Sequence, residues 1–226
     1  SDFNTLSLST MISNNSSFPA LYILQSSTNS ILQSYIQGST AAIVSGSTGT
    51  VLNLSVLVAT NTAGSALAFD GGGVNLTLTS SALQSPSLGR GLALNANNRG
   101  LLRLSSVTVT GAARGIQIST QADGFTLDID SITFRGLASG ATAVHFLGGT
   151  FVSTINLAGF EDSPPGANIS AAALDTASRI SMLSHSGPLS GPSYHNDPNG
   201  VIAWQGYEPY PGCAVSGPSP APSLGE

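Results

Sequence analysis

The stretch "LLRLSSVTVTGAARGIQIS", residues 101–119, alternates apolar and polar side chains, breaks at Gly-Ala-Ala-Arg-Gly and then alternates again. Residues 125–136, "FTLDIDSITFRG", show the same pattern in different letters. Alternation with a period of two is typical of β-strands, because successive side chains of a strand point to opposite faces. The distance between the two stretches predicts a structural repeat of about 25 residues.

Two short alternating elements recur along most of the chain. The first begins with a small residue and covers residues 20–23, 42–45, 66–69, 91–94, 115–118 and 143–146. The second has an x-Leu-x-Leu pattern, and its first apolar residues are Leu52, Leu76, Leu102, Leu127, Ile155 and Ile180, at intervals of 24 to 28 residues. A third short strand follows in the best repeats, at 107–109 and 132–134. We therefore expect three short strands in each repeat.

Three such strands, joined by turns rich in Gly, Asn and Ser, describe one coil of a single-stranded parallel β-helix. About 24 residues at roughly 3.3 Å each form a loop of about 80 Å, long enough to enclose a filled three-sided core. A helical repeat would need apolar residues at i, i+3 and i+4, and the recurrent glycine and β-branched residues argue against it. The sequence thus predicts an all-β solenoid of about seven to eight coils over residues 1–206, irregular from about residue 187.

In such a solenoid, each inward side chain packs on the equivalent side chain of the coil above and below. The predicted first column contains Leu67, Leu92, Ile116 and Val144. The predicted second column contains Phe69, Leu94, Ile118 and Phe146. The predicted third column contains Leu54, Leu78, Leu104, Ile129 and Leu157. Different aliphatic residues can fill one layer if their summed volume is kept.

The composition narrows the possible partners and the compartment. Only 8% of residues are charged, all six cations are arginines and the formal net charge is −5, so a nucleic-acid partner is not expected. No apolar run is long enough to span a membrane, and Cys213 stands alone, so no intrachain disulfide can form. Solubility then depends on neutral hydroxyl and amide groups, a composition common in secreted and surface β-proteins. We expect an extracellular or cell-surface protein, in mature form or as part of a longer chain, because no signal peptide precedes the first strand pattern.

The outward positions form ladders that run from coil to coil. On the second strand the predicted ladder contains Asn53, Thr77, Arg103, Asp128, Asn156 and Ser181. Arg103 and Asp128 should form an exposed ion pair there, contributing about 0–1 kcal/mol. On the first strand the predicted ladder, a candidate flat binding face with a small apolar half, contains Val44, Ala68, Ala93, Gln117 and His145.

The repeat and its Gly, Ser and Asn punctuation resemble the pectin-lyase-like superfamily of right-handed parallel β-helices over about residues 4–206. That superfamily includes polysaccharide lyases and hydrolases, phage tailspikes and non-catalytic surface proteins such as autotransporter passengers. The resemblance implies right-handed winding. Lyases of the group hold Ca²⁺ with acidic side chains and use an arginine or lysine to abstract a proton. Asp123, Asp128, Asp130 and Arg103 could imitate that arrangement, so a calcium cofactor belongs only to this lyase alternative.

The candidate catalytic residues also have a simpler interpretation. Asp128 and Asp130 lie two apart on one strand, so both should point outward, about 6.5–7 Å apart. Glycoside hydrolysis needs two such carboxyl groups, but the surrounding coils carry Thr77, Thr79, Asn156 and Ala158 at the equivalent positions, and none of these is acidic. A solvated Asp-x-Asp beside Arg103 is the interpretation we favour. The histidines, including His145, lack the spacing of metal ligands, so no metal site is expected.

We therefore expect a non-catalytic extracellular β-helix that serves as a stalk, matrix component or adhesin with carbohydrate or protein contacts. The alternatives are a polysaccharide lyase or hydrolase and a phage-type fibre or filament subunit. Asn-x-Ser/Thr sequons mark candidate glycosylation sites at Asn15, Asn53, Asn75 and Asn168. Residues 207–226 are Pro/Ser-rich and predict an extended tail or linker, while Trp204 is a candidate plug for the last coil.

Overall fold

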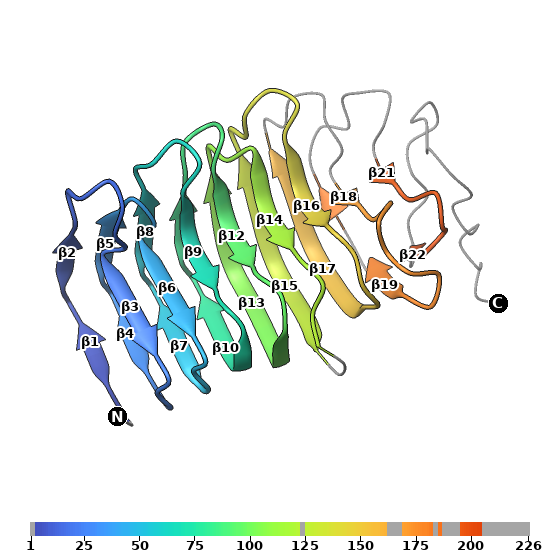
Figure 1. Cartoon of the computed structure of the whole chain (residues 1–226). Helices are drawn as coiled ribbons and strands as arrows, with labels where there is room; N and C mark the ends of the chain where they lie inside the picture. Colours follow the sequence, from blue (N-terminus) through green and yellow to red (C-terminus); the bar gives the residue numbers. More distant parts are fainter. Residues whose placement is uncertain (1–2, 123–124, 162–168, 183–184, 187–194, 205–226) are drawn as a thin grey trace.

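A computed structural model describes residues 3–122, 125–161, 169–182, 185–186 and 195–204. Every regular element in these ranges is a β-strand, and every pairing between the strands is parallel. The chain winds into a parallel β-helix of about seven turns, which confirms the predicted fold class. In Figure 1 the coils stack in sequence order, so that β1 and β22 lie at opposite ends of the described solenoid.

The strands form two sheets, here called sheet 1 and sheet 2. Sheet 1 contains β1 (Thr5–Ser7), β2 (Thr10–Ile12), β4 (Ser30–Leu32), β5 (Tyr35–Gly38), β7 (Thr50–Asn53), β8 (Val56–Ala59), β10 (Gly72–Thr79), β11 (Ala82–Gln84), β13 (Asn98–Thr110), β15 (Thr126–Arg135), β17 (Val152–Glu161), β19 (Arg179–Met182), β20 (His185–Ser186) and β22 (Ile202–Trp204). Sheet 2 contains β3 (Leu21–Leu24), β6 (Ala42–Ser45), β9 (Ser65–Phe69), β12 (Arg90–Leu94), β14 (Arg114–Ile118), β16 (Thr142–Phe146), β18 (Ile169–Ser170) and β21 (His195–Asn196).

Each of the first four coils crosses sheet 1 twice and sheet 2 once, as the predicted three strands per coil require. In β13, β15 and β17, the two strands of sheet 1 join into one continuous strand of 10 or 13 residues. The corner between the two halves of sheet 1 is marked in six coils by a residue with positive φ: Leu8, Gln33, Leu54, Ser80, Ser106 and Ser131. The chain therefore turns at the same place in coil after coil, whether or not the strand is interrupted.

The register places the apolar columns in the core. The first two predicted columns are confirmed, because Leu67, Leu92, Ile116 and Val144 pair in succession, as do Phe69, Leu94, Ile118 and Phe146. These side chains are buried. In the third column, Leu78, Leu104 and Ile129 also pair as expected. Successive turns of the backbone thus lie directly above one another.

Several residues of the predicted columns and ladders were placed wrongly, among them Leu54 and Val44. Leu78 pairs with Leu52 and not with Leu54, which sits at the corner with its side chain 53% exposed. Val44 pairs with Phe69 and is 1% exposed, so it belongs to the core and not to the outward ladder. A shift of two residues keeps the alternation of faces, which is why the first error was invisible in the sequence pattern. Ile155 takes the place assigned to Leu157, whose side chain lies outside the described residues.

Small residues on sheet 2 make room for the third side of the core. A Cβ on Gly91 would lie 2.3 Å from Cγ1 of Val109, and one on Gly115 would lie 2.5 Å from the ring of Phe134. Such distances are far shorter than a van der Waals contact. The large side chains of β13 and β15 therefore occupy the space that a side chain at position 91 or 115 would need. The recurrent small residue at the start of the first repeat element is thus a packing requirement.

The corner of sheet 1 contains a serine ladder, formed by Ser9, Ser34, Ser55 and Ser81. The backbone N–H of Ser9, Ser34 and Ser55 each donates to the Oγ of the serine in the next coil, at 3.3 Å for Ser34 to Ser55 and 3.1 Å for Ser55 to Ser81. Each hydroxyl in turn donates to the carbonyl oxygen two residues earlier in its own coil. In later coils the equivalent positions are the buried aliphatic residues Val107, Ile132 and Ala158.

Several expectations fall outside the described residues. These are the Pro/Ser-rich tail at 207–226 with Cys213, most of the irregular segment from 187, Asp123, and the side chain of Trp204. In the part of the chain that the structure describes, no helix is long and apolar enough to cross a membrane.

Candidate functional site

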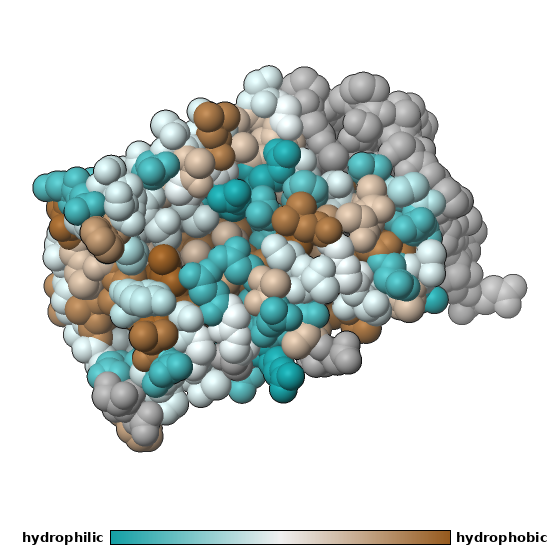
Figure 2. All heavy atoms as spheres, in the orientation of Figure 1, coloured by the Kyte–Doolittle hydropathy of each residue, from teal (hydrophilic) through white to brown (hydrophobic). Residues whose placement is uncertain are grey.

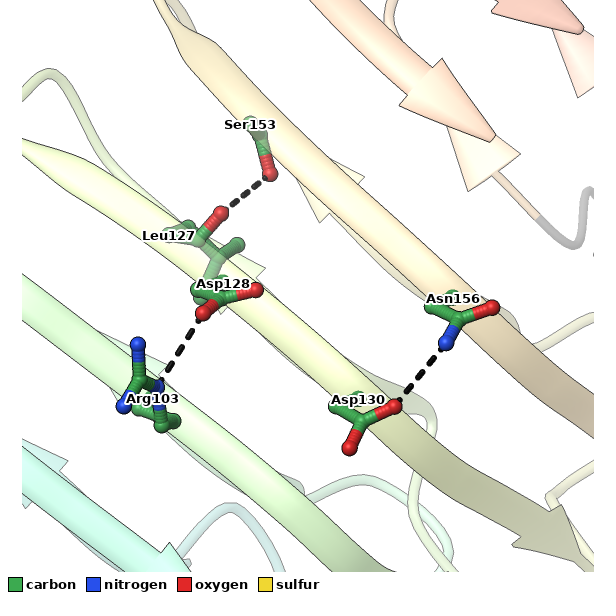
Figure 3. A network of polar contacts seen from close by, with 6 residues as sticks. All are labelled: Arg103, Leu127, Asp128, Asp130, Ser153 and Asn156. Carbon is green, nitrogen blue, oxygen red and sulfur yellow. Dashed lines mark hydrogen bonds and ion pairs between the residues drawn. The ribbon is translucent and has the colours of Figure 1, made fainter. Parts of the chain in front are cut away.

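The candidate catalytic residues lie together on the outer face of sheet 1, as Figure 3 shows. Arg103 on β13 pairs in register with Asp128 on β15, and Asp130 on β15 pairs with Asn156 on β17. Because inward and outward positions alternate, both aspartates point away from the core, as expected. The long strands β13, β15 and β17 therefore form the platform for these four side chains.

Each aspartate of the platform is held by a neighbour on another coil. Nε of Arg103 donates to Oδ2 of Asp128 at 3.1 Å, and the two side chains are 54% and 33% exposed. Nδ2 of Asn156 donates to Oδ1 of Asp130 at 3.0 Å. Beneath them, the buried Ser153 hydroxyl donates to the Leu127 carbonyl at 2.8 Å and ties β17 to β15. The predicted ion pair is thus confirmed, and Asp130 has an amide partner that the sequence did not suggest.

These side chains line a shallow hollow of about 400 Å³. The residues that line it are Arg103, Ser105, Asp128, Asp130, Thr154 and Asn156. The hollow offers guanidinium and amide donors, carboxylate acceptors and hydroxyl groups that serve as both. Such a surface is suited to a ligand that itself carries many hydroxyl groups.

The register separates the predicted outward ladder of sheet 1 into two. One ladder contains Val51, Thr77, Arg103, Asp128, Thr154 and Ser181. The other contains Asn53, Thr79, Ser105, Asp130 and Asn156. Asn53 and Asn156 were predicted on the ladder of Thr77 and Asp128, but they lie on the neighbouring ladder of Thr79 and Asp130. The two ladders run side by side, so the hollow has polar groups both from coil to coil and along each strand.

The outer face of sheet 2 differs from the predicted binding face. In the register, Ile43 takes the outward position that was assigned to Val44, followed by Ala68, Ala93, Gln117 and His145. Ala68 and Ala93 are only 7% and 4% exposed, so the small apolar half offers little accessible surface. Gln117 and His145 are half-buried. From Ala68 to His145, the accessible side chains of this ladder are therefore the two polar ones.

Two arginines that were not predicted as site residues hydrogen-bond to the polar side chains of this ladder. Nε of Arg90 donates to Oε1 of Gln117 at 3.0 Å, and Nε of Arg114 donates to Nδ1 of His145 at 3.0 Å. Burial and the neighbouring Arg114 charge lower the pKa of His145 from its ordinary value of 6.5. The signal available in the sequence was that Arg90 and Arg114 both open the first element of their repeats.

The sequons differ in accessibility. Asn15 is exposed and its Oδ1 accepts from the backbone N–H of Ser17 at 2.8 Å, and Asn75 is exposed with its Oδ1 accepting from the N–H of Leu101 at 3.2 Å. Asn53 is half-buried. Asn168 lies outside the described residues.

The end of the solenoid that holds β1, β2 and β3 is apolar and open. All three strands are edges of their sheets. Exposed large hydrophobic residues gather on the first coil and its turns, namely Phe3, Leu8, Ile12, Phe18, Tyr22 and Leu24. A hollow of about 300 Å³ lies between β1, β3 and β4. No acidic, basic or histidine residue occurs between residues 3 and 69.

The chain matched no protein-family model, no curated protein and no solved structure. The residues that the structure describes contain no group of three His, Cys, Asp or Glu side chains placed to hold a metal ion. Any functional assignment must therefore start from the two outer faces and the apolar end.

Proposed function

We propose that the chain is a non-catalytic β-helix of the extracellular space or cell surface that contacts carbohydrate along the outer face of sheet 1. Within this proposal it is a stalk, matrix component or adhesin, related to the surface proteins among the right-handed, pectin-lyase-like β-helices. The observation that carries the proposal is the hollow of about 400 Å³ on β13, β15 and β17, lined only by polar side chains.

The repeat of the solenoid supports contact with a polymer. Equivalent groups on adjacent coils are about 4.8 Å apart, which is close to the length of one sugar unit in an extended glycan. Thr154 and Ser105 offer hydroxyls, Asn156 offers an amide, and the aspartates offer acceptors along the same surface. Sugar hydroxyls donate and accept hydrogen bonds, so a surface that does both can follow a glycan over several coils.

The same contacts favour binding over cleavage. A glycosidase needs one carboxyl group that stays protonated, usually in an apolar pocket, and a second that is ionised. Here Asp128 is paired with Arg103 and Asp130 accepts from Asn156, both on an open face. Neither carboxyl group lies in the apolar pocket that a general acid of this kind occupies. The lyase and hydrolase alternative, with calcium as its cofactor, is therefore the weaker proposal.

Binding to an array of neutral and acidic polysaccharides tests this function. We expect Asp130→Asn and Asn156→Ala to weaken binding, and Asp175→Asn to leave it unchanged. Asp175 is the matched control because it is exposed on the turn before β19, away from the hollow, and its Oδ1 acceptor is retained in asparagine. Absence of binding to every polysaccharide would refute the proposal. Cleavage of a polysaccharide that disappears in Asp128→Asn would transfer the assignment to the enzyme alternative.

A second candidate function is that of a fibre or filament subunit, and the apolar end of the solenoid favours it. Natural edge strands are commonly protected by charged residues or proline. The edge strands β1, β2 and β3 contain no charged residue and no proline. Ile12 on β2 and Leu24 on β3 are exposed. We propose a second copy of this chain as the occupant, because two apolar ends with no charged residue between 3 and 69 can bury each other at little electrostatic cost. This head-to-head contact closes a dimer, and the dimer is the subunit of the proposed fibre.

Light scattering on a size-exclusion column tests the assembly. We expect oligomers that dissociate in Ile12→Lys and Leu24→Lys, while Leu88→Lys behaves like the unmodified chain. Leu88 is equally exposed but lies in the turn before β12, away from the apolar end. A monomer at high protein concentration would exclude the filament function and leave the carbohydrate proposal standing.

A further inference from the structure

Arg90 and Arg114 occupy the same position on adjacent coils of sheet 2. They pair in register at the starts of β12 and β14, with Ser65 before them and Thr142 after them in the same row. Residues paired in this way are about 4.8 Å apart. Two like charges at this distance on a sheet surface are destabilising unless something compensates for them.

Both guanidinium groups are oriented by neutral partners. Besides the Nε bonds to Gln117 and His145, Nη1 of Arg90 donates to the Ala63 carbonyl at 3.2 Å, and Nη1 of Arg114 donates to the Ala113 carbonyl at 2.8 Å. In the described ranges, Nη2 of each arginine makes no hydrogen bond. The charges are therefore held in place while donors on each group stay available.

No carboxylate faces the arginine pair from the described part of sheet 2. The outward ladder of this sheet contains Tyr22, Ile43, Ala68, Ala93, Gln117, His145, Ser170 and Asn196. Arg103 on sheet 1, by contrast, has Asp128 as its partner. Within the described ranges, the Arg90–Arg114 pair thus differs from the ion pair of the other face in having no carboxylate partner.

His145 adds a further donor to the same surface. Its Nδ1 accepts the hydrogen bond from Arg114, so the neutral ring carries its proton on Nε2. The lowered pKa of His145 agrees with this neutral form. The imidazole N–H and the two guanidinium groups therefore belong to one cluster of donors on β12, β14 and β16.

We propose that Arg90, Arg114 and His145 form a binding site for an anionic group, a carboxylate or sulfate ester, on an acidic glycan. Guanidinium groups bind such planar or tetrahedral oxyanions through paired hydrogen bonds, which makes arginine better suited than lysine to this task. An anion between the two arginines supplies the missing counter-charge. The glycan as carrier rests on the proposed function, whereas the anion site stands on the arginine pair itself.

The test is an NMR titration of the full chain that follows the imidazole resonances of His145. The probes are an oligogalacturonate, a sulfated oligosaccharide, inorganic sulfate and a neutral glucose oligosaccharide. We expect both acidic oligosaccharides to shift the His145 signals, with affinity falling at least about tenfold in Arg90→Gln and in Arg114→Gln. Arg99→Gln is the matched control, because Arg99 is exposed on β13 and its loss changes the net charge equally.

The outcomes separate this site from the proposed function. Unmoved His145 signals, or equal binding in the Arg90, Arg114 and Arg99 variants, would overturn the anion site. Binding of inorganic sulfate as tightly as either acidic oligosaccharide would overturn the glycan as its carrier. Unmoved His145 signals together with binding of a neutral polysaccharide that depends on Asp130 and Asn156 would refute this inference and keep the proposed function.

Discussion

The coils at residues 3–69 and those at residues 98–161 follow one backbone path with different chemistry. The first group contains no charged residue and has a serine directly after the positive-φ residue of its sheet 1 corner, whereas the second carries charged outer ladders and has an aliphatic residue at that position. In the serine corner, a backbone N–H donates to a side-chain oxygen, and the strand is interrupted there. In the aliphatic corner the backbone ladder continues, so β13, β15 and β17 are long. Strand register therefore fixes the path of the backbone, and the residue that follows the corner decides whether the strand is continuous.

The largest effect is expected from the interior column that crosses both regions. Leu52→Ala should lower the free energy of unfolding by about 2–5 kcal/mol, because it leaves a cavity between the stacked side chains of Ile31 and Leu78. Leu54→Ala, at the exposed corner, should change it by less than about 0.5 kcal/mol. Urea unfolding of the two variants measures the difference. Equal losses would show that the register of these coils is wrong.

The serine corner offers the next test. Ser55→Ala removes the acceptor for the buried N–H of Ser34 and should cost about 1–3 kcal/mol. Ser7→Ala, exposed on β1, is the control and should be near neutral. A neutral Ser55→Ala, measured by the same urea unfolding, would mean that the hydroxyl ladder does not stabilise the first coils.

The response to acid should come from the later coils, since residues 3–69 hold no acid, base or histidine. The pKa of His145 is lowered by burial and by Arg114, so the unfolded chain binds a proton more readily than the native chain. The stability from neutral His145 is complete above pH 6.5 and is lost as the pH falls below that value. Urea unfolding at about pH 5 and about pH 7.5 should therefore show a smaller difference for His145→Gln than for the unmodified chain. Gln117→Ala, on the same ladder, should keep the original difference.

The smallest effect is expected at the exposed ion pair of the later coils. Asp128→Asn should reduce stability by no more than about 1 kcal/mol, and the loss should shrink at high salt. A double-mutant cycle with Arg103→Gln measures the pair itself. A coupling of several kcal/mol would mean that these charges are far less solvated than their exposure indicates.

The sequence was sufficient for the fold and for part of the surface. Period-two alternation and a repeat near 25 residues predicted the columns at Leu67 and Phe69 and the facing of Arg103 and Asp128. It misplaced Leu54 because Leu78 lies 24 residues after Leu54 but 26 residues after its true partner Leu52, and a two-residue slip leaves the pattern unchanged.

Contacts that cross coils were harder to predict. The bonds from Arg90 to Gln117 and from Arg114 to His145 span 27 and 31 residues and depend on how far a side chain reaches. Period and composition carry no information about that reach. The serine ladder, in contrast, left a trace in the sequence, because its serines recur at intervals of 21 to 26 residues.

Because the coils stack in register, one whole coil is the segment that can be deleted or duplicated with least disturbance to the rest. Each coil begins and ends at the same place on the perimeter, so excising or duplicating one complete turn joins backbone ends that already match. The molecule would become shorter or longer by one fixed step while both outer faces kept their alignment. Length is thus a property that such a chain can vary by copying a segment of its gene, without inventing a new contact.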